Sequence, residues 1–202
     1  MSLPDAVPPA VIEFSTNTAR VGWAGSAEPE VVQKPCPGHV HDGLIDNAVA
    51  ALAWSIRALE SHGKSGESGT ARAPNRAVLC EALWQPRSTR EAWSEAAFET
   101  HGLDAVGVLK SPVAALFAHA RTTGMVLDGG SHAVDILPVQ DGYPVMMGAR
   151  RSTLGGTGLC AYLKKLLAEG DAAEAAASHA VSTTAYRYVK VVTGDLRYEL
   201  KA

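Results

Sequence analysis

The 202-residue sequence predicts an α/β fold in which helices cover a sheet. Short segments with strand character, such as AVLCEAL at 77–83 and AVGVL at 105–109, alternate with segments that have a helical apolar period. A hydrophobic content of 47% is enough to bury one large core or two small ones. Together these observations indicate a layered α/β protein.

The N-terminal third of the chain predicts two strands, a loop and a helix. Residues 10–25 have the pattern of two short strands around a polar turn at Ser15–Thr18. The segment 29–43 is rich in Pro and Gly and is expected to be a connecting loop. A helix follows, with Asp42 or Asp46 as its expected N-cap. Its apolar residues recur at steps of four and three: Ile45, Val49, Leu52, Ile56 and Leu59.

The middle of the chain continues the alternation. Residues 61–76, rich in Gly and Ser, predict a flexible linker before the strand at 77–83. Ser88 with Glu91 forms a capping-box pattern, which predicts the start of a helix. Ser111 followed by proline predicts a second helix start after the strand at 105–109.

The C-terminal third predicts a hairpin and two helices. Gly124–Leu127 and Ala133–Gln140 are expected strands on either side of a Gly turn. A helix that ends near Gly170 is indicated by Leu159, Tyr162, Leu163, Leu166 and Leu167. A last helical stretch is expected at Ser182–Val192.

Charge and targeting signals narrow the partners and the compartment. The formal net charge is −3, with 18 basic and 21 acidic residues mixed along the chain, so neither nucleic acid nor an anionic membrane is an expected partner. The chain has no apolar run of the ~20 residues that a membrane helix needs and no secretory signal at its start. Three widely separated cysteines fit a reducing compartment and predict no metal site. We therefore expect an intracellular protein.

Several segments, in order, resemble actin and the actin-related proteins. They are IEFSTNTARVGWAG, VLCEALWQPRSTREAWSEAAFET, ARTTGMVLDGG with VDILPVQDGY, GGTGLCAYLKKLL and VKVVTGDLRYEL. The segment RTTG-x-V-x-D-x-G is particularly distinctive of that family. The resemblance implies an actin-like (ribonuclease H-like) mixed sheet flanked by helices, with ATP and a divalent cation between two related domains.

The resemblance also predicts a domain organisation. Residues 1–9 are an expected irregular N-terminus, 10–120 a first actin-like domain, and 121–202 a partial second domain. A family chain is nearly twice as long, so this one would be truncated. Between His39 and Gly43 the family inserts a mobile subdomain for filament contacts, which the sequence lacks.

In the first phosphate loop, the resemblance places Glu13 at the family's metal-facing aspartate and Arg20 at its phosphate-binding lysine. Thr16 stands at a serine position, while Ser15 and Asn17 replace glycines that permit positive φ. A buried or cleft-lining carboxylate needs a partner, so a structural Glu13–Arg20 pair is the favoured alternative to a metal site.

In the second phosphate loop, Asp128, Gly129 and Gly130 keep the acidic turn, but Ser131 and His132 follow it. Ser131 replaces an aspartate that polarises the attacking water. The water-positioning glutamine and the supporting histidine correspond to Ser111 and Asp135. Near the nucleoside, Lys190 keeps a basic residue, while Thr193 and Gly194 replace a lysine and a glutamate. The residues left for a vestigial ATP cleft are Glu13, Thr16, Arg20, Asp128, Gly129, Gly130, Gly156 and Lys190.

Because positioning of water contributes much of phosphoryl-transfer catalysis, these changes predict a protein that is not an enzyme and needs no cofactor. Two functions remain open from the sequence. The first is a non-catalytic actin-related adaptor in a cytoskeletal, ciliary or chromatin-associated assembly, whose partners cover the missing half of the fold. The second is a divergent protein that binds ATP or ADP with Mg and hydrolyses ATP slowly or not at all. In the first, the Asp128 turn is scaffold.

Overall fold

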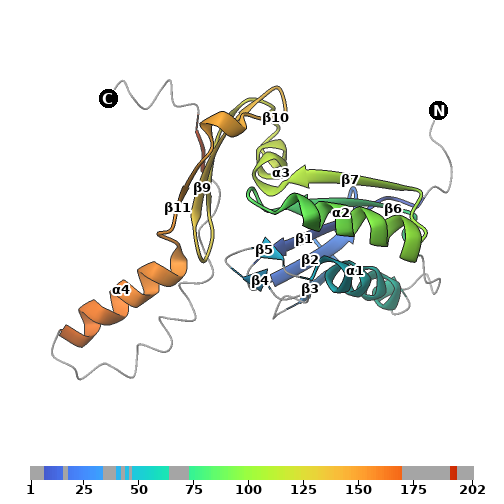
Figure 1. The fold of residues 1–202 in the computed structure, drawn as a ribbon, viewed down its shortest axis with the longest axis horizontal. Helices are drawn as coiled ribbons and strands as arrows, with labels where there is room; N and C mark the ends of the chain where they lie inside the picture. Colours follow the sequence, from blue (N-terminus) through green and yellow to red (C-terminus); the bar gives the residue numbers. More distant parts are fainter. Residues whose placement is uncertain are drawn as a thin grey trace. The chain divides into compact units, whose positions relative to one another are not determined.

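A computed structural model describes residues 7–15, 18–33, 40–41, 44–45, 47–63, 73–169 and 192–194 (Figure 1). The chain forms two compact units, Met1–Ser111 and Pro112–Ala202. Each unit contains its own sheet. The assignment of an irregular residue 1–9 segment and of actin-like domains at 10–120 and 121–202 stays a prediction.

The sheet of the first unit has five strands in the order β3 (Val31–Gln33), β2 (Thr18–Trp23), β1 (Ala10–Ser15), β6 (Arg76–Glu81) and β7 (Ala105–Lys110). The first three strands are antiparallel neighbours, whereas β1, β6 and β7 run parallel. Parallel neighbours need a crossover connection, and α2 supplies the one between β6 and β7. The expected α/β class, a mixed sheet flanked by helices, is confirmed.

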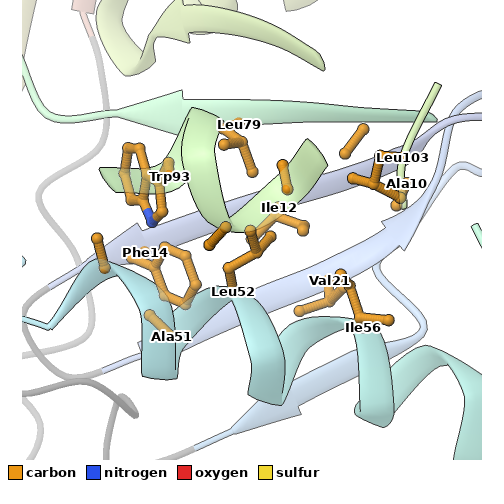
Figure 2. Close-up of a cluster of buried hydrophobic side chains, with 14 of the residues drawn as sticks. Ala10, Ile12, Phe14, Val21, Ala51, Leu52, Ile56, Leu79, Trp93 and Leu103 are labelled. Atoms are coloured by element: carbon orange, nitrogen blue, oxygen red, sulfur yellow. The ribbon is translucent and has the colours of Figure 1, made fainter. Parts of the chain in front are cut away.

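Helices α1 (Ala48–Gly63) and α2 (Arg87–Glu95) pack on one face of this sheet. The residues of β1 alternate, so that Ile12 and Phe14 enter the core while Glu13 lies on the opposite face. Figure 2 shows Phe14 beside the fully buried Trp93 of α2, with ring centroids 6.2 Å apart. A π-helical turn at Ala96–Thr100 extends α2 and adds two buried alanines to the same core.

Four local predictions for this unit were wrong. The expected loop at 29–43 contains two short strands. Strand β3 pairs with β2, because its valines can extend the sheet at its edge. Strand β4 (Val40–His41) pairs with β5 (Leu44–Ile45). The helix α1 is capped by Asn47, whose side-chain oxygen accepts the Ala50 N–H at 3.0 Å; Asp42 and Asp46 lie outside the described residues.

The other two errors concern helix boundaries. The predicted linker 61–76 begins inside α1, which continues to Gly63, and it ends inside β6; residues 64–72 lie outside the described part. The predicted capping box at the start of α2 does not form. Pro86 occupies the N-cap, and Glu91 instead pairs with Arg87 at 2.8 Å.

The second unit has an antiparallel sheet in the order β10 (Tyr143–Pro144), β9 (Val134–Gln140), β8 (Gly124–Gly129) and β12 (Val192–Gly194). Strand β11 (Arg150–Ser152) also pairs with β9. Strands β8 and β9 confirm the predicted hairpin. Val192, the last residue of a predicted helix at 182–192, is in a strand, because it pairs with Leu127; residues 182–191 lie outside the described ranges.

Two helices complete the described part of this unit. Helix α3 (Ser111–Ala118) begins at Ser111, the last residue of the first unit, and its Val113 and Leu116 are buried. Helix α4 (Gly156–Glu169) starts three residues before the first predicted apolar position, Leu159. A 3-10 turn at Met146–Gly148 joins β10 to β11. Among the described ranges, no helix combines the length and apolarity that a membrane crossing requires.

Candidate functional site

In the first unit, the two predicted phosphate-loop side chains meet each other. Glu13 on β1 and Arg20 on β2 are directly opposite in the antiparallel register. Arg20 Nη1 donates to Glu13 Oε2 at 3.0 Å, and both side chains are about 40% exposed. The expected structural pair is therefore present. Thr16 and Asn17, which follow β1 in the sequence, lie outside the described residues.

Cys80 lies next to this pair in the sheet and was not singled out by the sequence. It is the register partner of Glu13 on the parallel strand β6, and its side chain is buried. Burial, reinforced by the Glu13 carboxylate, raises the pKa of the Cys80 thiol from 9.0 to about 11. Cys80 is thus held as a neutral thiol and is a poor nucleophile at neutral pH.

Position 111, where the resemblance places a water-positioning glutamine, is tied to the end of β6. The Ser111 hydroxyl donates to the main-chain oxygen of Glu81 at 3.1 Å. Serine is too short to reach a water that a glutamine would hold from the same backbone position. This contact therefore directs the Ser111 hydroxyl into its own unit.

Beside Ser111 is a buried charge cluster that sequence patterns did not reveal. The Glu81 carboxylate, 2% exposed, pairs with Arg90 of α2 and with Lys110 at the end of β7, whose Nζ lies 2.8 Å from Glu81 Oε1. The hydrogen bond to Glu81 raises the pKa of Arg90 above its ordinary value. Register position gives a partial signal, since Glu81 and Lys110 end neighbouring parallel strands and are aligned with each other.

A shallow hollow of about 490 Å³ lies on α2, not at the predicted cleft residues. It is lined by Arg87, Arg90, Glu91 and Ser94. Arg87 and Glu91 pair across one helical turn, and Arg90 contacts Glu81. The charged side chains of this hollow therefore already have partners within the protein.

In the second unit, the acidic turn retains the geometry of a β-hairpin. Asp128 of β8 is directly opposite Asp135 of β9, and Gly129 is opposite Val134. Asp135 Oδ1 lies 3.6 Å from Arg151 Nε on β11, the register partner on the other side. Asp135, which stands where the family has a histidine, is thus part of a sheet ion pair.

The start of α4 is packed against the same hairpin turn. Gly130 donates its N–H to Ala133 O at 2.8 Å, and it accepts the Gly156 N–H at 3.0 Å. Thr157 donates its N–H to Ser131 O at 2.7 Å. A Cβ on Gly155 would lie 2.4 to 2.6 Å from main-chain atoms of Ser131, His132 and Ala133, so only glycine permits this approach. The structure therefore brings Gly130 and Gly156 together.

Several residues predicted for an ATP cleft are bonded within their own unit. Phosphates need free N–H donors and cations, whereas the amides of Gly130 and Gly156 bond to main-chain oxygens and Arg20 bonds to Glu13. A divalent cation needs free carboxylate oxygens, and Glu13 is paired. Two further predicted contacts, Thr16 and Lys190, lie outside the described residues. Within the described ranges, no group of three or more His, Cys, Asp or Glu side chains could hold a metal ion.

Comparison with known proteins identifies the family of the chain. Residues 61–190, more than half of the chain, match the family model described as Actin. The chain is similar to "Actin-like protein 9" of Bos taurus, with 27% identity over 200 residues that cover 81% of this chain and 47% of the relative. It thus spans about half the length of that relative. On this evidence the chain belongs to the actin family.

Proposed function

We propose that this actin-family protein is a non-catalytic structural or adaptor subunit of a larger multiprotein assembly. The observation that carries the proposal is the contact of Ser111, whose hydroxyl donates to Glu81 O at 3.1 Å. An actin-like hydrolase needs a side chain at this position that holds water in line with the γ-phosphate. Without such a side chain, we expect the fold to bind other proteins and not to hydrolyse ATP.

The surface of α4 supports a role in protein binding. Leu159, Tyr162, Leu163 and Leu166 recur at helical spacing, and each is 36–60% exposed. Side chains at these spacings form one face of a helix. Contiguous apolar surface of this kind usually marks a contact with another protein.

The proposal names protein partners and excludes a membrane or direct nucleic acid binding, since the charge of the chain is mixed and its net value is −3. Cytoskeletal, ciliary and chromatin-associated assemblies are the candidates that the family resemblance offers. We place the protein inside the cell, in the cytoplasm or cytoskeleton, including a cilium or flagellum, with the nucleus as the second compartment.

Affinity purification of the tagged chain from its own cells tests the adaptor role. The chain should copurify with a defined set of proteins, and Leu159→Glu with Leu166→Glu should lose them because two charges interrupt the apolar face of α4. Ala161→Glu places the same charge at another exposed position of α4 and should keep them. Recovery of the chain alone, as a monomer, would contradict the proposal.

Thermal unfolding with Mg-ATP separates this role from the alternative, a divergent nucleotide-binding actin. The alternative has support from the intact Asp128–Gly130 hairpin, and it predicts stabilisation of about 2.7 kcal/mol at a hundredfold excess over Kd. We expect no rise in Tm at millimolar Mg-ATP. A rise in the natural chain that disappears in Glu13→Gln would instead assign a nucleotide to the first hairpin.

A further inference from the structure

The crossover from the first unit to the second contains no loop. Strand β7 ends at Lys110 and α3 begins at Ser111, the residue at which the first unit ends. The next residue, Pro112, is buried and has no N–H to contribute. Packing of Pro112 therefore holds the junction on its C-terminal side, and the side chains of Lys110 and Ser111 are the groups that can hold it on its N-terminal side.

Three contacts join Lys110 and Ser111 to the end of β6. Lys110 Nζ lies 2.8 Å from Glu81 Oε1 and donates to Ala82 O at 3.3 Å. The Ser111 hydroxyl donates to Glu81 O at 3.1 Å. Both consecutive residues of the crossover are thus held at one point, the Glu81–Ala82 corner.

At the Glu81–Ala82 corner, two cations face one carboxylate. One buried carboxylate, Glu81, contacts two cations, and Arg90 alone would neutralise it. Arg90 also forms a second hydrogen bond, from Nε to Glu81 Oε2 at 3.3 Å. The lysine is therefore not needed to compensate the buried charge, although its side chain is only 15% exposed.

We propose that the ion pair of Lys110 with Glu81 holds the β7–α3 junction in place. The junction opens locally only when the Lys110 ammonium leaves Glu81. Arg90 provides the charge balance of Glu81 from α2, and Lys110 provides the attachment of the β7–α3 junction. This assignment gives the two cations on one carboxylate different roles, and the roles can be separated by substitution.

Hydrogen–deuterium exchange of the full chain, read over residues 105–120, tests the assignment. Lys110→Met should speed exchange at the first turn of α3 by about tenfold, whereas Lys110→Arg should keep the natural rate. Arg90→Met removes the other cation from the same carboxylate and should speed exchange in α2 without speeding it at the junction. Exchange over β1 and β2 reports whether each variant remains folded.

Three results would overturn the proposal. The first is unchanged junction exchange in Lys110→Met, and the second is equal acceleration there in Arg90→Met. The third is loss of protection throughout the first unit of Lys110→Met, because Arg90 should suffice to compensate Glu81. Ser111→Ala, which keeps all charges, should accelerate junction exchange less than Lys110→Met does.

Discussion

The two units satisfy the polar groups of their family-related hairpins in different ways. In the first unit, charged side chains pair with one another, as Glu13 does with Arg20 and Glu81 does with Arg90 and Lys110. In the second unit, main-chain groups bond to main-chain groups at the hairpin turn, as the Gly156 N–H does to Gly130 O, and the strands add one ion pair, Asp135 with Arg151. The first arrangement depends on charge and the second on the absence of a Cβ.

Under the proposed function, this difference separates the backbone features of an actin-like hairpin from the side chains that would handle water. In the first hairpin, Glu13 and Arg20 have the same signs of charge as the family residues to which the resemblance assigns them. The two side chains form an ion pair with each other. The second hairpin has a continuous register and a contact with α4, and Ser131 and Asp135 stand where the resemblance places an aspartate and a histidine. The backbone frame is thus separable from the chemistry, and each unit should be sensitive to a different class of substitution.

The largest expected effect is the loss of the buried charge in the first unit. Glu81→Gln leaves Lys110 and Arg90 next to a neutral amide and should lower the free energy of unfolding by about 3 kcal/mol. Glu13→Gln, in an exposed pair, should cost less than about 1 kcal/mol. Urea unfolding of both variants measures the difference. Equal costs would mean that burial does not distinguish the two ion pairs.

In the second unit, the most destabilising substitution should be one that introduces a steric clash. Gly155→Ala places a Cβ 2.4 to 2.6 Å from three main-chain atoms of the hairpin turn, and should destabilise this unit by about 2 kcal/mol. Gly158→Ala, in α4, is the matched control, because its Cβ would make only an ordinary contact, 3.7 Å from Leu154 Cδ1, and alanine favours a helix. Hydrogen exchange over β8 and β9 reports both. Similar protection in the two variants would show that the α4 contact is dispensable.

The sequence predicted the elements whose signals are local. Alternation of apolar residues in β1, the strands β6 and β7, and the hairpin β8–β9 follow from short-range pattern, and the structure confirms them. The Glu13–Arg20 pair was also predictable, because residues on either side of a hairpin turn become opposite one another. The ordered family segments supplied the fold class.

What the sequence did not predict depends on contacts between distant residues. The edge strand β3 was missed since its valines stand among prolines and only pairing with β2 makes them a strand. The capping box at Ser88 was wrong because Glu91 pairs with Arg87 instead. The Glu81 cluster joins residues from β6, α2 and β7, and no spacing rule relates these positions.

Alkaline pH should affect the first unit through Cys80. Its pKa is raised from 9.0 to about 11, so the folded state retains a proton that the unfolded chain loses. The contribution of the Cys80 proton to the free energy of unfolding is fully present below pH 9. It is lost as the pH rises from 9 to about 11, by an amount on the order of 2 kcal/mol. Cys80→Ala should remove this part of the pH profile, and Glu13→Gln should reduce it. Identical profiles for the natural chain and Cys80→Ala would contradict the assignment.

The smallest expected effect is a gain in stability. It tests whether a left-handed residue at the end of α3 costs free energy in the second unit. Helix α3 ends in a Schellman motif, with Arg121 N–H bonded to Leu116 O at 3.3 Å and Ala120 N–H bonded to Phe117 O at 2.8 Å. Ala120 has a φ of 55°, a left-handed conformation in which a Cβ is unfavourable. Ala120→Gly should therefore stabilise the protein by about 1 kcal/mol, while Ala115→Gly, inside the helix, should destabilise it by about as much. Chemical denaturation of the pair measures the sign directly. If both variants lose stability, the gain from relieving the left-handed residue is smaller than the entropy that the added glycine gives the unfolded chain.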